Sequence, residues 1–281
     1  MVNSKTQAFA NILCISFSPF DNYQEIIKLQ DDINKEMPFS FIGLNKSEPA
    51  NLDDEFIKSL KNCQCSKRKM QMLSNALKTL ATDPIFNHSE LNELISMDCN
   101  NDTGDLQLQE NQSKVSSSFN NLSSGHQVIM ISLIQLVERI TERTLVILDE
   151  PENHLHPPLL SAFIRTLSEL LIEQNGVSII ATHSPIILQE VPKSCVWKIN
   201  RSGYEVAANR LEMESFGATI SSLTHEVFGL EVNNSGFHKM LIEEVNKGES
   251  FNSIVEKFNN ELGDEARALL RTMIFERDVR T

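Results

Sequence analysis

A short apolar segment that ends in two adjacent carboxylates constrains this sequence more than any other feature. Residues Thr144 to Leu148 read TLVIL and are followed directly by Asp149 and Glu150. A run without polar alternation is typical of a strand buried on both faces of a parallel sheet. Carboxylates at the end of such a strand are costly unless a cation or a polarised water compensates them. The segment therefore predicts a nucleotide-hydrolysis site, in which Asp149 positions Mg²⁺ through its waters and Glu150 orients or deprotonates the attacking water.

Two further segments flank this strand in the sequence. LSSGHQ precedes it at residues 122–127, and a second apolar strand, Val177 to Ala181, ends in THSP at residues 182–185. Ser123, Ser124 and Gly125 open a helix, and small residues there let backbone N–H groups approach phosphate oxygens at the positive end of the helix dipole. An ordinary N-cap serine is the alternative interpretation of Ser123.

The order LSSG, LDEP and then a strand ending in THS resembles the ABC-type ATPases. The stretch EPENHLHP at residues 150–157 is similar to their SMC, RecF and OLD-like branch. This resemblance implies that residues 123–125 contact a nucleotide held by an opposite subunit, and that His183 is the switch histidine that reaches the γ-phosphate. A hydrogen-bonded histidine at a strand end is the alternative. LSSGHQ departs from the usual LSGGQ at Ser124 and His126, which puts the contact details of that segment in doubt.

The sequence contains no glycine-rich phosphate loop. Such a loop, GxxxxGK[ST], cradles the phosphates with backbone N–H groups, and none of the ten glycines here is followed by lysine. In the resembled family the loop precedes the region with which this sequence begins. We therefore expect the C-terminal portion of an ABC ATPase, arising from truncation, a split gene or an engineered fragment, which alone does not hold ATP in the usual way.

The apolar patterns predict an α/β fold of the ABC ATPase type: a mainly parallel sheet with helices on both faces, a helical insertion and a helical C-terminal tail. A segment rich in Asn, Asp, Gln and Ser, residues 97–118, is expected to form an exposed loop. Four segments are expected: a partial N-terminal ATPase lobe (1–44), a helical insertion with a flexible loop (45–114), the ATPase core (115–211) and a helical C-terminal region (212–281).

Composition restricts the function classes. A net charge of −13 disfavours non-specific nucleic-acid binding, although SKRK at residues 66–69 is either a solvated helix face or a local nucleic-acid or partner contact. Five scattered cysteines indicate reduced thiols in a cytoplasmic protein. The absence of an 18-residue apolar run predicts no membrane span. Cys63 and Cys65 could form half of a zinc site, but no further ligands complete it. For Glu152, His154 and His156, metal binding is an alternative to the roles that the resemblance implies.

The resemblance also implies partners. Subunits of the family dimerise head to tail around ATP and Mg²⁺, so a homodimer or larger homo-oligomer is expected. The short insertion, EPENHLHP and the tail segment LGDEARALL are most similar to ATPases of Septu and retron-linked antiphage systems, which act with an HNH nuclease. We identify no nuclease motif in the chain itself, and nucleic acid is left open as a further partner. The alternatives are a non-hydrolysing regulatory or scaffold half and a DNA-repair ATPase of the RecF or OLD type.

Overall fold

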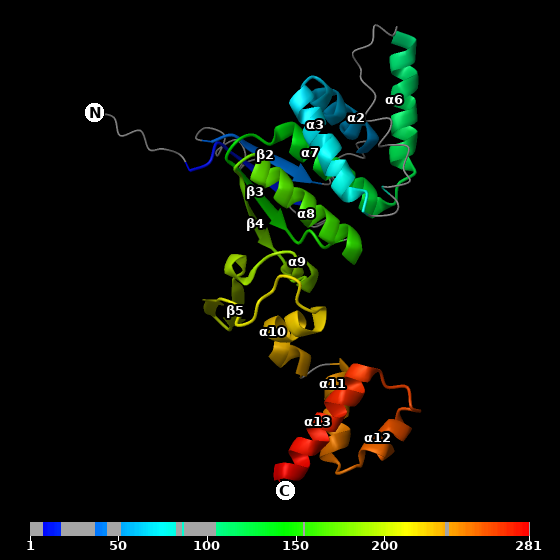
Figure 1. Cartoon of the computed structure of the whole chain (residues 1–281), viewed down its shortest axis with the longest axis vertical. Helices are drawn as coiled ribbons and strands as arrows, with labels where there is room; N and C mark the ends of the chain where they lie inside the picture. The colour runs from blue at the N-terminus through cyan, green and yellow to red at the C-terminus, as the bar shows by residue number, and fades with distance from the viewer. Residues whose placement is uncertain are drawn as a thin grey trace, which may run out of the picture. The chain divides into compact units, whose positions relative to one another are not determined.

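A computed structural model describes residues 8–17, 37–43, 52–82, 86, 105–153, 155–233 and 236–280 of the chain (Figure 1). The polypeptide divides into two compact units, Met1–Glu190 and Val191–Thr281. The first unit contains every residue that the sequence predicts for the hydrolysis site.

The first unit is built on a four-stranded parallel sheet with the strand order β2-β1-β3-β4. The strands are β1 (Asn11–Ser16), β2 (Phe39–Gly43), β3 (Thr144–Asp149) and β4 (Val177–Ala181). The register places Ser16 beside Asp149, and Asp149 beside Ala181. Because parallel strands end at the same edge of a sheet, the residues that follow β3 and β4 meet there. The α/β fold with a mainly parallel sheet is thus confirmed.

Helices accompany this sheet. They are α2 (Leu52–Gln64), α3 (Lys67–Leu80), α6 (Asp105–Asn120), α7 (Ser124–Arg139), α8 (Pro157–Glu173) and α9 (Pro185–Gln189). Helix α8 connects β3 to β4, which pair in parallel. Pro157 and Pro158 occupy the first turn of α8, where a missing N–H costs nothing, and His156 Nδ1 accepts a bond from the Leu159 N–H at 3.4 Å.

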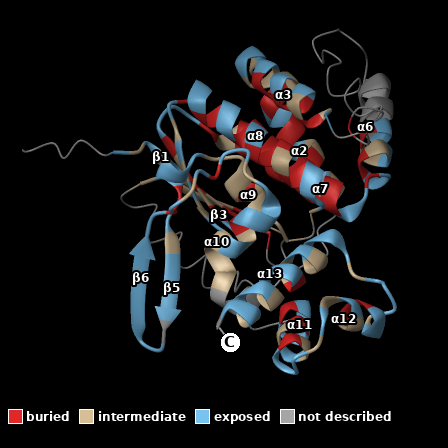
Figure 2. Ribbon diagram, turned by 60° about the horizontal axis from the view of Figure 1, so that its bottom comes forward, coloured by how far each residue is buried: buried red, intermediate tan, exposed pale blue. Residues whose placement is uncertain are grey.

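One face of the sheet and these helices share a single core (Figure 2). The sheet contributes buried side chains that alternate along β1 and β3, as a pleated strand requires: Leu13, Ile15, Val146 and Leu148, with Ile42 from β2. We expected helices on both faces. Within the part of the chain that the structure describes, the helices of the first unit all contribute to the core on this one face.

Among the described residues of the insertion, a helix forms where a loop was expected. Helices α2 and α3 form in the segment where a helical insertion is expected, whereas the loop expected at 97–118 is wrong over its second part, where α6 forms. Val115 and Phe119, four residues apart, are both buried, and the Phe119 ring stacks on Phe56 of α2 at 4.7 Å. The polar composition of the segment conceals this short apolar stripe, which is sufficient to fix a helix by tertiary packing.

The second unit combines an antiparallel hairpin with helices. Its strands are β5 (Lys198–Ser202) and β6 (Glu205–Asn209), turning at Gly203 with a φ of 62°. The short 3₁₀ helix η1 (Lys193–Cys195) precedes them, and α10 (Ile220–Asn233), α11 (Gly236–Asn246), α12 (Phe251–Lys257) and α13 (Asp264–Arg280) follow. Leu241, Ile254 and Leu270 belong to the core of the last three. Across the described ranges, no helix is both long and apolar enough to cross a membrane.

Candidate nucleotide-hydrolysis site

The predicted catalytic carboxylates lie at the carboxyl edge of the sheet. Asp149 is the last residue of β3 and is exposed, and Glu150 follows it. Glu150 has a φ of 43°, a left-handed conformation that is uncommon for a residue with a side chain. Its N–H donates to the carbonyl of Ala181 at 2.9 Å, which ties the end of β3 to the end of β4. Such a conformation at a strand end is typical of functional sites, where surrounding contacts hold the strain.

His183 lies beside these carboxylates. It follows β4 by two residues, and its Nδ1 lies 3.6 Å from Glu150 Oε1 and 3.1 Å from Glu152 Oε1. The His183 side chain is 63% exposed and that of Glu150 is 48% exposed, so both can meet a molecule arriving from solvent. The structure therefore brings together Glu150 and His183, which are 33 positions apart. Their catalytic roles stay predictions.

Glu152 organises this edge in a way that sequence reasoning missed. Its side chain is only 10% exposed, and its Oε1 accepts bonds from Thr182 Oγ1 and from the His183 backbone N–H, both at 2.8 Å. Its Oε2 is buried and has no hydrogen-bond partner among the residues that the structure describes. Since a buried carboxylate requires donors, Glu152 fixes the turn that carries His183. The only available signal was an acid two residues after Glu150, which we interpreted as a metal-ligand alternative.

The predicted signature residues begin helix α7. Ser123 is the N-cap of this helix, and Ser124 and Gly125 form its first turn. The Ser123 hydroxyl does not cap a backbone N–H; it lies 2.5 Å from Nδ1 of His126, which is buried. The His126 ring is 5.5 Å from that of His156, just before α8. Ser123 and Ser124 are exposed, while Gly125 is buried.

The alternative metal and nucleic-acid interpretations gain no support from contacts in the structure. His156 caps α8, and His154 lies outside the described residues. Within the ranges that can be described, no group of three or more His, Cys, Asp or Glu side chains is arranged to hold a metal ion. In the basic segment, Arg68 donates to Gln174 Oε1 at 3.1 Å and Lys69 donates to the carbonyl of Glu138. These two cations therefore bind the protein itself.

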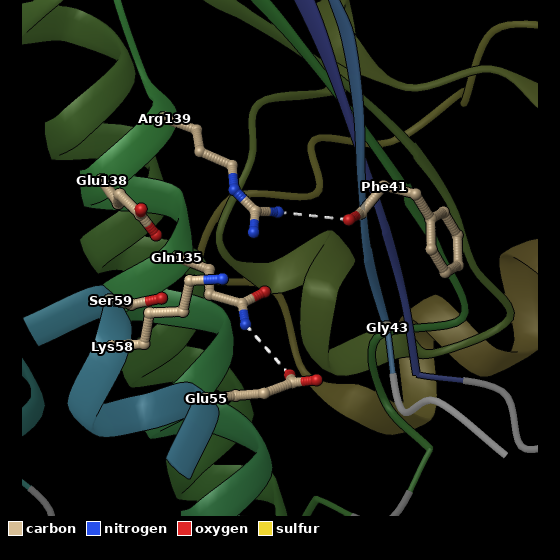
Figure 3. Close-up of a pocket in the computed structure, with 8 residues that line it drawn as sticks. All are labelled: Phe41, Gly43, Glu55, Lys58, Ser59, Gln135, Glu138 and Arg139. Carbon is tan, nitrogen blue, oxygen red and sulfur yellow. Dashed lines mark hydrogen bonds between the residues drawn. The ribbon is translucent and has the colours of Figure 1, made fainter. Parts of the chain in front are cut away.

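A separate cavity of about 250 Å³ lies among α2, α7 and β2 (Figure 3). Arg139 donates to the carbonyl of Phe41 at 3.2 Å, and Gln135 donates to Glu55 at 3.3 Å. The lining contains two acids and two bases: Glu55, Glu138, Lys58 and Arg139, together with Phe41, Gly43, Ser59 and Gln135. None of the predicted site residues lines it, so this cavity is distinct from the carboxylate edge.

Asp149 at the end of β3, Glu150 directly after it and His183 after β4 form the edge for which the sequence predicts a nucleotide-hydrolysis site. A comparison with protein families agrees. The family model described as "AAA domain, putative AbiEii toxin, Type IV TA system" matches residues 11–189, and this chain belongs to that family. The match runs from β1 to the end of α9 and includes every predicted site residue. The chain thus contains an AAA-type, nucleotide-binding ATPase domain.

One curated relative extends the comparison. Protein ea59 of Escherichia phage lambda is 40% identical to this chain over 284 residues, an alignment that covers 96% of the chain. The same alignment covers 54% of ea59, so the chain spans about half the length of this relative.

Proposed function

We propose that this chain supplies the hydrolytic half of an ATPase site: Glu150 as the general base, His183 as the γ-phosphate contact and Asp149 as the Mg²⁺-side carboxylate. The observation that supports this most directly is the convergence of Glu150 and His183, 3.6 Å apart and both open to solvent at one sheet edge. A base and a hydrogen-bond donor this close can face the same attacking water and phosphate.

The donor set at this edge fits the magnesium ion that such ATPases use. Mg²⁺ prefers hard oxygen ligands and keeps several of its waters, so one exposed carboxylate suffices to position it. Asp149 is exposed, and the register places Ser16, a hydroxyl residue, directly beside it. Asp149 would hold the ion through water, and the bound ion would neutralise charge on the phosphate oxygens.

The remaining groups orient the base and the histidine. Asn153 donates to Glu150 Oε2 at 3.1 Å, which leaves Oε1 as the oxygen nearer to His183. Glu150 would accept the proton of the attacking water, while His183 would donate to a γ-phosphate oxygen. Glu152 acts as a positioning residue, because its Oε1 accepts from the backbone N–H of His183 and lies 3.1 Å from the ring nitrogen Nδ1 of His183.

At a finer level, we propose an ABC-type arrangement. The N-terminus of α7, with exposed Ser123 and Ser124 followed by buried Gly125, would close on a nucleotide held by a second subunit in a head-to-tail dimer. The resemblance to Septu and retron-linked ATPases and the family's description as a putative toxin of a type IV toxin–antitoxin system support a defence role. A partner nuclease would then carry out cleavage. The absence of a glycine–lysine pair favours one alternative, a non-hydrolysing regulatory half.

Substitution of Glu150 tests the proposal. In the chain joined to a segment that carries a phosphate loop, Glu150→Gln should lower phosphate release from ATP at least about a hundredfold, because the base is lost while binding contacts remain. ATP should stay bound to the variant in a filter assay. Glu142→Gln, an exposed acid just before the start of β3, is the matched control and should retain activity. Undiminished turnover by Glu150→Gln would remove Glu150 from the mechanism.

A further inference from the structure

The cavity among α2, α7 and β2 takes no part in the proposed hydrolysis site, yet four ionised side chains line it. Glu55 and Lys58 belong to α2, and Glu138 and Arg139 belong to α7. In the part of the chain that the structure describes, no ion pair joins any two of these four side chains. Charged groups that are partly withdrawn from water normally pair with one another, so unpaired charges of both signs around one cavity are available to a ligand.

The charged groups of the cavity keep free hydrogen-bonding capacity. Arg139 Nη1 donates to the carbonyl of Phe41 at 3.2 Å, and Glu55 Oε2 accepts from Gln135 at 3.3 Å. A guanidinium group has five donors and a carboxylate has two oxygens, so each can bind a further group. Lys58 is exposed, has no hydrogen bond or ion pair to any described residue, and extends from α2 toward α7 (Figure 3).

Buried polar side chains around the same cavity also have unused capacity. Ser59 is only 4% exposed, and its hydroxyl forms no hydrogen bond with the described residues. Gln135 is 7% exposed and donates to Glu55, while its own side-chain oxygen accepts nothing from them. Glu138 Oε2 is buried and has no partner either. Because buried polar groups in folded proteins are normally hydrogen-bonded, these groups indicate that the cavity holds polar molecules.

We propose that this cavity binds a small zwitterion of the α-amino-acid class. Its ammonium group would lie at the carboxylates of Glu55 and Glu138, which can only accept hydrogen bonds. Its carboxylate would lie at Lys58 and Arg139, which can only donate, and a guanidinium group suits a carboxylate geometrically. The Ser59 hydroxyl can both donate and accept, so it fits a polar group on either side of the ligand. The inference does not depend on the proposed ATPase function.

Size and charge exclude other ligand classes. The cavity volume of about 250 Å³ lies below the roughly 300–1,000 Å³ that is typical of pockets for larger organic ligands. A nucleotide is too large for it, and its phosphates would face the carboxylates of Glu55 and Glu138. A bare metal ion would face two bases, and the described residues offer no group of three or more His, Cys, Asp or Glu to hold one. An ion of one sign would leave the opposite charges of the lining unpaired.

The test is titration calorimetry of the full 281-residue chain with each of the standard L-α-amino acids, beside acetate and methylamine. At least one amino acid should bind saturably, and acetate and methylamine should bind at least about tenfold more weakly, because each lacks one of the two charges. Lys58→Met should weaken binding of that amino acid at least about tenfold. Lys61→Met is the matched control, an exposed lysine of the same helix outside the cavity, and should bind normally.

Folding of the variants is separable from binding. Lys58 and Lys61 are both exposed, so both variants should keep the melting temperature of the wild-type chain. Glu55→Gln provides a second variant on the acidic side: its amide oxygen can still accept from Gln135, while the charge that the ammonium group requires is lost, so affinity should fall similarly.

Three results would overturn the proposal. Absence of saturable binding by every amino acid would show that the cavity holds only water. Acetate or methylamine binding as tightly as the best amino acid would make it a site for a single ion. Equal affinities of Lys58→Met and Lys61→Met for the amino acid would place the binding site elsewhere on the protein.

Discussion

Glu152 holds the turn that carries His183. It is nearly buried, and one of its oxygens holds both the Thr182 hydroxyl and the backbone N–H of His183. Removal of this acceptor leaves buried donors unsatisfied, which costs about 1–3 kcal/mol. We therefore predict that Glu152→Ala lowers the free energy of unfolding by about that amount, whereas Glu152→Gln, whose amide oxygen still accepts, costs less. Urea unfolding of the two variants measures the difference, and equal losses would show that these bonds do not stabilise the turn.

The site residues differ in how readily sequence reveals them. Asp149, Glu150 and His183 each follow an apolar run, and a polar residue at the end of a buried strand can be recognised without a structure. The role of Glu152 could not be predicted, because its donors come from the end of β4, 30 positions away. The bond between Ser123 and His126 was also unforeseen, because whether a serine caps its helix or binds a side chain depends on local geometry.

Helix α6 is joined to α2 by side-chain hydrogen bonds to Asp53. Asp53 of α2 accepts bonds from Ser116 Oγ at 2.6 Å and from Asn120 Nδ2 at 3.3 Å, and both donors belong to α6. The bond from Ser116 is the main reason that the pKa of Asp53 lies below its ordinary value of 3.8. A carboxylate whose pKa is lower in the folded state stabilises the fold at pH values above its pKa in the unfolded chain. This stabilisation is lost as the pH falls through the pKa that the group has in the folded state.

A matched pair of serines in α6 tests this connection. Ser116→Ala should lower the free energy of unfolding by about 0.5–1.5 kcal/mol at neutral pH, the net contribution of one such bond. Ser117→Ala, at the neighbouring exposed position, should be neutral or slightly stabilising, since alanine is the best helix former. The deficit of Ser116→Ala should diminish in acid, where Asp53 is protonated. Denaturant titrations at neutral and acid pH provide the comparison, and a deficit that does not change with pH would contradict it.

The predictability of the elements follows from the strength of their apolar patterns. Strands β3 and β4 are strongly patterned, and their observed ends lie within one residue of the predicted ones. Helix α6 was predicted as a loop because only Val115 and Phe119 mark its buried side in the part whose side chains are described. Helix α9 has only five residues, too few for periodicity to distinguish it from a turn.

Stability of the first unit as a whole should depend on pH through one buried thiol. Cys63 lies between α2 and α7, and burial, helped by the nearby Glu138 carboxylate, raises its pKa from 9.0 to about 12. A raised pKa in the folded state means that the unfolded chain loses this proton first, so stability falls as pH rises from 9.0 towards 12. Cys63→Ala should show a shallower decrease over this range. Urea unfolding at a series of alkaline pH values measures both slopes, and parallel slopes would exclude Cys63.

For the molecule as a whole, the central claim is that this chain contributes the catalytic carboxylates and histidine of an ATPase whose phosphate loop comes from other polypeptide. The most direct test is ATP hydrolysis with Mg²⁺ by the 281-residue chain alone, beside the same chain extended at its N-terminus by a segment that carries a phosphate loop. Turnover by the extended chain only, at a rate well above that of the short chain, is the predicted result. Hydrolysis by the short chain alone, lost on Glu150→Gln, would contradict the account, because the chain would then hold ATP without the loop.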